Sequence, residues 1–512
     1  MNKIETYLNP LSATKINYRA EILAGLTVAM TMMPESLSFA IVTGFTPLMG
    51  LYAAFLMGLI TALFGGRPGM ISGGAGATAI VFTALVISHG VEYVLGAVVV
   101  AGIIQILVGV FKWGKFIRLV PESVMYGFVN GLAVVIFTAQ FSQFKIKDTL
   151  GNETWMMGND LWLMLSLVAL TIAIIYVFPK ITKIIPASLA AIIIVTLVTV
   201  GFDIQTKTVA DIASVSGSLP QFHIPNIPMN WESLAIILQY GVVMAGVGLT
   251  ESLLTLTLVD QICENRGSSN QEAIAQGAAN VANGFLGGMG GCAMIAQSFI
   301  NLEAGARSRL SGIIGALAIL AVILFAAPVI EKIPMAALVG VMFIVAINTF
   351  KWSSFKIVNK VPNTDMIVVV VVASITIFFH NLALAVLTGV IIASLVFAWE
   401  SAKRIRARKS IDEAGRKVYE IFGPLFFAST ANFMDKFDIA NDPQIVVIDF
   451  AESRIADMSA IETISKLTEL YKKYNKTLIL RHLSEDSRNL LANAASIIEV
   501  NIEEDPTYRI PI

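Results

Sequence analysis

Two glutamates, Glu35 and Glu251, stand inside long apolar stretches of the sequence. A carboxylate at membrane depth costs several kcal/mol and therefore marks a proton carrier or a cation ligand. Thr255 lies one helical turn after Glu251, so the oxygens of these two residues share a helix face and suit a proton or a small cation such as sodium. For both glutamates the alternative is a hydrogen bond between helices.

Two glycine-rich segments supply a second kind of chemistry. One contains Gly69, Gly73, Gly74 and Gly76, and the other contains Gly287, Gly288, Gly290 and Gly291. We expect each to be extended chain that leads into a half-helix, which is tolerated at membrane depth only inside protein or beside water. Two half-helix amino termini would offer free N–H groups and positive dipole ends to an anion. The alternative is a pair of small-residue packing faces between helices.

The composition indicates which elements position these residues. Of the 512 residues, 56% are hydrophobic and 14% are charged, and the net charge is -1. Soluble domains have about 25% charged residues and nucleic-acid-binding proteins need a basic surface, so the composition argues against both classes. Apolar stretches long enough to cross a bilayer follow one another through residues 21–400. They predict a polytopic α-helical membrane protein with 14 transmembrane segments, near 21–43, 46–65, 74–89, 91–111, 119–142, 160–178, 184–201, 231–259, 271–288, 290–303, 310–330, 334–350, 364–380 and 382–400.

The distribution of Lys and Arg predicts the orientation. With the amino terminus inside the cell, the short cytoplasmic loops carry fifteen of these residues and the opposite loops carry four. Positive residues stay on the cytoplasmic side, so we expect a cytoplasmic segment at 1–20, cytoplasmic termini and an inner (plasma) membrane location. No nucleophile, base and orienting group can be assembled, and Cys263 and Cys292 are too few for a zinc cage. We therefore expect no enzyme and no cofactor beyond a sodium ion.

An internal repeat relates the two halves of the membrane region. The tripeptide Glu-Ser-Leu at 35–37 recurs at 251–253, and at the same offset of 216 residues Gly74–Ala77 aligns with Gly290–Ala293. Pro121 and Gly127 match Pro334 and Gly340 at an offset of 213. Repeats at about 21–201 and 231–400 with seven spans each form an inverted repeat, which is typical of alternating-access transport. The alternative is chance matching in apolar sequence.

The carboxyl-terminal region has ordinary charge density. A basic linker at 401–414 precedes a soluble domain at 415–512, in which 418–422, 444–450 and 478–481 are predicted strands and 458–473 a predicted helix. This alternation favours a small α/β domain. Ser459, at the start of the helix, is either a plain N-cap, which we favour, or a regulatory phosphorylation site.

Several short motifs resemble the sulfate permease (SulP) family with a STAS domain at its end. In the membrane region they are MPESL at 33–37, GFTPLMGLY at 44–52, the stretch 65–77, ESLLT at 251–255 and NLEAGAR at 301–307. In the soluble domain they are FGPLFF at 422–427, IVVIDF at 445–450 and DMS at 457–459.

The resemblance implies a 7+7 inverted repeat, shared with nucleobase transporters, in which a core domain moves against a gate domain. It also implies a homodimer. It places the substrate anion between the starts of spans three and ten, here Ala75, Gly76, Ala77, Cys292 and Ala293. It gives Glu251 and Thr255 the position that serves sodium or proton coupling in symporting members. Family substrates include sulfate, bicarbonate, chloride and dicarboxylates.

Two positions depart from the family pattern. Gln297 stands where many members have Arg, and Glu35 stands where Gln is common, so the site is more negative and favours cation-coupled uptake. Phe39, one turn after Glu35, either walls the cavity or simply packs.

We expect secondary active transport of an inorganic anion, sulfate or bicarbonate, coupled to sodium or protons. The partners are then the anion, the coupling ion, membrane lipid, a second copy and a protein partner at the STAS domain, with no nucleic acid. The alternatives are a proton-coupled nucleobase or dicarboxylate carrier of the same fold, and a channel-like or sensor protein with STAS output.

Overall fold

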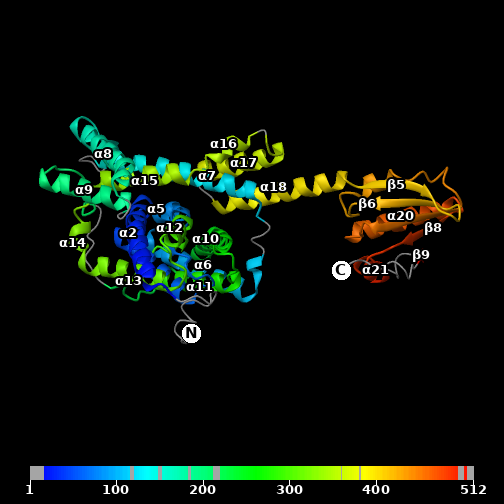
Figure 1. Ribbon diagram of the computed structural model, residues 1–512, viewed down its shortest axis with the longest axis horizontal. Helices are drawn as coiled ribbons and strands as arrows, with labels where there is room; N and C mark the ends of the chain where they lie inside the picture. Colours follow the sequence, from blue (N-terminus) through cyan, green and yellow to red (C-terminus); the bar gives the residue numbers. More distant parts are fainter. Residues whose placement is uncertain are drawn as a thin grey trace. The chain divides into compact units, whose positions relative to one another are not determined.

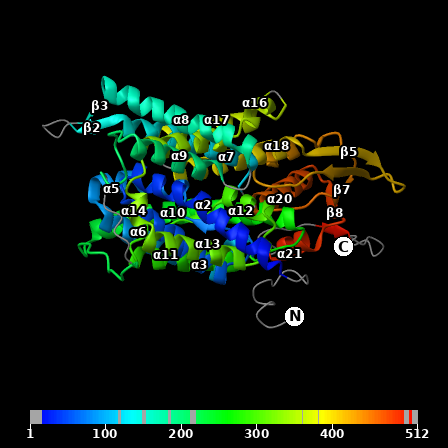
Figure 2. The same ribbon diagram turned by 60° about the vertical axis from the view of Figure 1, so that its left-hand side comes forward.

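The computed structural model describes residues 16–115, 120–147, 153–182, 186–211, 219–358, 360–379, 382–493 and 501–503. The chain forms two compact units, Met1–Val390 and Ile391–Ile512 (Figures 1 and 2). The predicted amino-terminal segment up to residue 15, residues 504–512 of the predicted soluble domain, and Arg118 and Lys183 of the orientation argument lie outside the described residues.

The membrane unit is helical, as predicted. Its first half contains α2 (Tyr18–Val42), α3 (Pro47–Phe64), α4 (Gly76–Val81), α5 (Thr83–His89), α6 (Val91–Val110), α7 (Glu122–Ala139), α8 (Asn159–Ile181) and α9 (Ala187–Gly201), with the short strands β2 (Lys145–Lys147) and β3 (Glu153–Trp155). The second half contains α10 (Trp231–Cys263), α11 (Ser269–Phe285), α12 (Ile295–Glu303), α13 (Leu310–Phe325), α14 (Ala327–Ile330), α15 (Met335–Thr349), α16 (Ser353–Ile357), α17 (Asn363–Phe379) and the start of α18 (Leu382–Lys403), which continues into the second unit. In the described residues, 8 helices are long and apolar enough to cross a membrane. The count of 14 spans stays a prediction.

Side-chain caps fix where several of these helices begin. The Asn17 side chain accepts a hydrogen bond from the Ala20 N–H at 3.3 Å, and the Asn230 side chain accepts one from the Ser233 N–H at 2.7 Å. Both occupy a free amino-terminal donor of their helix. α2 continues through Pro34, which has no N–H to donate within the helix. One missing hydrogen bond is tolerated there because α2 is packed between other helices along most of its length.

Two short strands interrupt the helical pattern. β1 (Ser72–Gly73) pairs antiparallel with β4 (Cys292–Ala293), with Ser72 opposite Ala293 and Gly73 opposite Cys292. Each strand leads into a helix, α4 at Gly76 and α12 at Ile295. The predicted extended chain feeding a half-helix is therefore present in both halves.

The structure corrects the detailed alignment of the repeat at this point. The equivalent of Gly76 is Ile295, so the predicted match of Gly74–Ala77 with Gly290–Ala293 is wrong by three or four residues. Matching glycines misled the alignment because they do different work. Gly290 supplies a turn with φ +74° before β4, whereas its predicted equivalent, Gly74, follows β1.

The helices of the membrane unit pack in two groups (Figures 1 and 2). The core group comprises α2–α6 and α10–α13, in which α6 packs on α10 and α11 while α13 packs on α2 and α3. The gate group comprises α7–α9 and α15–α17, in which α7 packs on α17 and α15 packs on α7 and α8. α2 touches α9 and α15 and so joins the two groups.

The second unit is an α/β domain, as predicted. Its sheet has the order β5-β6-β7-β8-β9, from β5 (Arg406–Ile411), β6 (Lys417–Phe422), β7 (Ile445–Glu452), β8 (Thr477–Arg481) and β9 (Asn501–Glu503). The first pair is antiparallel and the other pairs are parallel. The helices are α19 (Thr430–Met434), α20 (Met458–Lys473) and α21 (Glu485–Asn493).

Two predictions for this unit need correction. The stretch 401–414, expected to be a basic linker, contains strand β5, whose run of Lys and Arg concealed its pairing with β6. Asp457, not Ser459, is the N-cap of α20, because its carboxylate accepts the Ala460 N–H at 2.9 Å and the Phe427 N–H at 2.7 Å. Ser459 is the second residue of the helix, and its regulatory role stays a prediction.

A buried carboxylate organises the core of this α/β domain. Asp442 is 4% exposed, accepts hydrogen bonds from the hydroxyls of Tyr419 at 2.9 Å and Tyr471 at 2.5 Å, and pairs with the Lys417 ammonium at 2.5 Å. Burial raises the pKa of Asp442, but the bonds from Lys417 and the two tyrosines outweigh burial and hold that pKa below its ordinary value.

We predict that Gly291→Ala destabilises the membrane unit. A methyl group at Gly291 would lie 2.0 Å from the Gly73 carbonyl oxygen, so the two strands must separate. Such overpacking costs about 1–3 kcal/mol, which thermal unfolding of the purified protein would detect as a lower Tm. Gly246→Ala is the matched control, because nothing lies within 4 Å of the added methyl group. Equal Tm values for the two variants would contradict the close approach of β1 and β4.

We predict that Asp442→Asn lowers the free energy of unfolding of the α/β domain by about 2 kcal/mol at neutral pH. The depressed pKa of Asp442 means that its contribution is complete above about pH 4, the unfolded pKa, and is lost as the pH falls below it. Hydrogen exchange of the β6 and β7 amides in wild type and variant should therefore differ at pH 7 and converge under acid. Asp438→Asn, at an exposed site, is the control. A difference that does not depend on pH would contradict the role of the ionised carboxylate.

Candidate functional site

The starts of α4 and α12 leave main-chain N–H groups without side-chain caps. The N-cap positions are Ala75 and Met294, and neither side chain accepts a hydrogen bond from its helix. The first N–H donors of a helix have no partner inside the helix, and the dipole adds positive potential there. The pairing of β1 with β4 brings these two starts to one place in the core group. This arrangement suits an anion.

Glu251 lies directly beside the start of the second half-helix. The Cys292 thiol donates a hydrogen bond to the Glu251 carboxylate at 3.0 Å, and the Ala293 N–H donates to the Ser252 hydroxyl at 3.0 Å. These two contacts attach α10 to β4. The Glu-Ser pair found in the sequence therefore supports the backbone of the site and places a carboxylate within it.

Thr255 is buried on the same helix as Glu251, as predicted. Its hydroxyl donates to the Glu251 main-chain carbonyl at 2.8 Å. The bond fixes the Thr255 hydroxyl with its oxygen lone pairs free to accept or coordinate. In the described residues no group of three or more His, Cys, Asp or Glu side chains is placed to hold a metal ion. A sodium ion held by Glu251 and Thr255 stays a prediction.

Glu35 and Gln297 meet across the site. The Gln297 amide on α12 donates to the Glu35 carboxylate on α2 at 2.5 Å, and Gln297 is 1% exposed. Glu35 also lines a cavity of about 460 Å³ between the core and gate groups. Other polar residues on its wall are Thr27 and Thr31 of α2, Ser188 of α9 and Asn348 of α15. The two positions that depart from the family pattern are therefore direct partners.

Phe39 packs on the first residue of the first half-helix. A Cβ atom at Gly76 would lie 2.4 Å from the Phe39 ring, so only glycine leaves room for the ring at this position. Phe39 is buried, and the neighbouring Ala75 and Ala77 are buried as well. Phe39 thus contacts the predicted substrate segment through packing.

Sequence reasoning missed the polar side chains that hold the two strands. The Asn280 amide on α11 donates to the Gly291 carbonyl at 3.1 Å and accepts the Gly291 N–H at 2.9 Å. Gln276, one turn earlier, donates to the Ser72 hydroxyl at 2.7 Å and to the Glu272 carboxylate at 2.7 Å. Glu272, Gln276 and Asn280 recur every four residues within a predicted membrane span. That polar stripe on one helix face was the available signal.

The contacts of charged residues near the glycine-rich segments were also missed. The Glu21 carboxylate accepts N–H groups from Arg307 at 2.7 Å, Ser308 at 2.8 Å and Ser311 at 3.0 Å, which caps α13. Arg67 and Arg309 belong to the fifteen residues that the orientation prediction assigns to cytoplasmic loops, and both are buried. Arg67 pairs with Asp260 at 3.2 Å, and Arg309 donates to main-chain carbonyls of α3 and the residue after it. These contacts hold the core group together.

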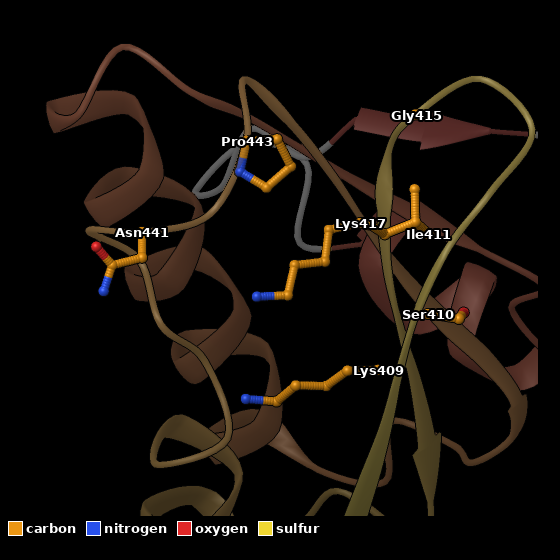
Figure 3. Close-up of a pocket in the computed structure, with 7 residues that line it drawn as sticks. All are labelled: Lys409, Ser410, Ile411, Gly415, Lys417, Asn441 and Pro443. Carbon is orange, nitrogen blue, oxygen red and sulfur yellow. The ribbon is translucent and has the colours of Figure 1, made fainter.

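The α/β domain contains a separate cavity of about 410 Å³ (Figure 3). Its lining residues are Lys409, Ser410, Ile411, Gly415, Lys417, Asn441 and Pro443. Figure 3 shows the Lys409 and Lys417 side chains extending from neighbouring strands toward the segment that carries Asn441. Both ammonium groups lie over the Tyr419 ring, at 5.3 and 5.2 Å, and Lys417 also pairs with Asp442. The lysines are therefore engaged within the domain.

The arrangement can hold an anion with backbone N–H groups while two carboxylates stand close by. The structure brings together Glu35 with Gln297, Phe39 with Gly76, and Glu251 with Cys292. Among the described contacts of these residues, none involves a Lys or Arg side chain.

Comparison with known proteins gives a consistent result. The model of the sulfate permease family matches residues 18–372, and that of the STAS domain matches residues 405–505. The chain is 38% identical over 479 residues to the putative sulfate transporter YbaR of Bacillus subtilis, covering 94% of this chain and 97% of that protein. It is 30% identical over 342 residues to the bicarbonate transporter BicA of Picosynechococcus sp., covering 62% of this chain and 59% of that protein.

Two solved structures resemble this one. The transmembrane domain of a cyanobacterial bicarbonate transporter BicA has a TM-score of 0.61 and 26% identity, covering 74% of this chain and 97% of that chain. The murine Solute Carrier 26 family member A9 anion transporter in its inward-facing state has a TM-score of 0.80 and 17% identity, covering 96% of this chain and 91% of that chain. The second likeness shows the fold alone. The chain belongs to the sulfate permease family and is a multi-pass membrane protein that ends in a STAS domain.

Proposed function

We propose that this protein is a secondary active transporter that carries an inorganic anion, sulfate or bicarbonate, across the inner membrane by alternating access and is coupled to sodium or protons. The observation that carries the proposal is the β1–β4 pair, which sets two uncapped half-helix starts beside Glu251. The relatives named as sulfate and bicarbonate transporters support the substrate class.

The carboxylates give a physical reason for coupling. An anion bound at the half-helix starts would be repelled by ionised Glu35 and Glu251, since like charges a few ångströms apart in a low-dielectric site disfavour each other. A proton or a sodium ion on either carboxylate removes that repulsion. Cation and anion then favour each other's binding, and this reciprocal coupling is what a symporter needs.

The cavity beside Glu35 supports a path for the substrate. Thr27 and Thr31 lie on the first half of α2, and Asn348 lies near the end of α15, so the cavity occupies the side that the loop charges predict to be cytoplasmic. Its walls come from both helix groups. Movement of the core group against the gate group would close this cavity and open the opposite side, as in other inverted-repeat carriers.

The proposal includes a homodimer with cytoplasmic termini and a protein partner at the STAS domain. It also includes sodium as the one candidate bound ion, at Glu251 and Thr255. The buried alanines at the half-helix starts, Ala75, Ala77 and Ala293, bring no side-chain donors that would read a nucleobase edge, which favours a small inorganic anion.

We predict that Glu251→Gln abolishes concentrative uptake. Wild-type protein in proteoliposomes should accumulate labelled sulfate or labelled bicarbonate above equilibrium under an inward sodium gradient or, separately, a proton gradient. The variant cannot change its charge, so its uptake should stop at the equilibrium level. Glu264→Gln, an exposed glutamate at the end of the same helix, is the control. If Glu251→Gln accumulates the anion under a gradient as well as wild type does, Glu251 has no role in coupling.

We predict that Gln297→Arg changes anion selectivity or coupling. A guanidinium here would form an ion pair with Glu35 and add positive charge beside the half-helix start. We expect the ratio of sulfate to bicarbonate uptake, or its dependence on the gradient, to change by about fivefold or more, which corresponds to about 1 kcal/mol. Gln205→Arg, in an exposed loop, is the control. If both variants transport like wild type, Gln297 is not near the substrate.

A further inference from the structure

An apolar groove runs along the outside of the gate group, away from the glutamates. It has a volume of about 270 Å³ and lies between α7, α16 and α17. Its walls include Val134 of α7, Met366, Val370 and Ala373 of α17, and Phe350 and Phe355 beside α16. Val370 is 58% exposed and Phe355 is 65% exposed, so the groove is open to the surroundings of the helix bundle.

Two polar residues that line the groove, Asn130 and Ser354, are bonded to each other. The Asn130 amide donates to the Ser354 hydroxyl at 2.7 Å and accepts the Lys351 N–H at 2.8 Å. The Ser354 hydroxyl in turn donates to the Lys351 carbonyl at 2.5 Å. Because these polar groups are already hydrogen-bonded, the groove suits an apolar ligand better than a free anion.

Three lysines lie next to or close to groove-lining residues in the sequence, and they form what we call the basic rim. Each groove-lining phenylalanine beside α16 is followed by a lysine, Lys351 after Phe350 and Lys356 after Phe355, and Lys360 follows closely. All three lysines are exposed, and in the described part of the chain none of them forms an ion pair with a carboxylate. Asp365 is the one acidic residue between 350 and 366, so the segment has a net charge of +2.

An aromatic cluster places this rim in a lipid headgroup region. The rings of Phe350, Trp352 and Phe355 lie 5.0–6.2 Å apart, and Trp352 is 58% exposed. Exposed Trp beside Lys is typical of the membrane interface, where aromatic rings sit at headgroup level and Lys reaches the phosphate.

We propose that this groove binds one acyl chain of an anionic phospholipid, whose headgroup phosphate lies against Lys356 and Lys360. The apolar groove holds the chain, and the net positive rim selects an acidic headgroup over a zwitterionic one. This site does not depend on the proposed transport function, because it lies on the gate group and its ligand is lipid.

Native mass spectrometry of the full-length protein tests the proposal. The protein is purified in detergent and offered equimolar phosphatidylglycerol and phosphatidylcholine of matched chains. We expect wild type to retain phosphatidylglycerol in preference. In the double variant Lys356→Gln with Lys360→Gln, the ratio of retained phosphatidylglycerol to retained phosphatidylcholine should fall about fivefold or more, which corresponds to about 1 kcal/mol. The Tm of the variant should equal that of wild type. Lys180→Gln, at an exposed lysine near the end of α8, is the control and should behave like wild type.

A second variant tests the groove itself. Val370→Phe should fill the space without disturbing the contact between α7 and α17, because Val370 is exposed, and it should reduce retention of both lipids. Equal retention of the two lipids by wild type would overturn the proposal, as would an unaltered preference in the lysine variant. A dimer that dissociates in Val370→Phe while lipid retention stays unchanged would assign the groove to a second copy of the chain and equally overturn it.

Discussion

The main-chain polar groups of two interrupted segments are the constraint on which this structure depends. Unpaired N–H and C=O groups cost several kcal/mol each where no water reaches them. β1 and β4 satisfy each other, Asn280 satisfies both polar groups of Gly291, and Ser252 accepts the Ala293 N–H. Gly291 must be glycine because the Gly73 carbonyl fills the space of a side chain. At the starts of α4 and α12 the N-cap side chains accept no hydrogen bond, so the first N–H groups of these two helices can face a ligand.

A site built from main-chain groups leaves charge balance to a few side chains. Backbone donors attract an anion without carrying a full charge, so the sign and strength of nearby ionised groups decide which cargo is stable there. Here those groups are carboxylates, one bonded to the Cys292 thiol and the other to the Gln297 amide. Both partners are neutral donors, so neither hydrogen bond forms an ion pair with the carboxylate. The departures from the family pattern thus change the electrostatics without changing the fold.

Structural features that depend on local sequence patterns were predicted from the sequence. Features that depend on contacts between distant residues were not. Apolar length predicted the helices, and clustered glycines predicted the strand-to-helix segments. The partners of those segments were not evident, because Asn280 reaches Gly291 only after α11 packs on α6. Local rules also failed where two residues compete. Asp457 and Ser459 are both good caps, and the bond from the Phe427 N–H, 30 residues away, favours Asp457. Likewise β5 is a strand through its pairing with β6.

The two helix groups differ in how they are joined, and this difference bears on movement. Inside the core group, α6 and α11 approach so closely that a Cβ at Gly102 would lie 2.6 Å from the Gly277 carbonyl, so the two backbones are in direct contact. Between the groups, α2 meets α9 and α15 through buried apolar residues such as Leu37 and Leu338 of one hydrophobic cluster. Apolar contacts do not depend on direction. Close packing of one backbone against another, in contrast, fits in one relative position only. In the proposed alternating-access movement, sliding of the core group along α15 would therefore exchange equivalent contacts, while deformation within the core group would break specific ones.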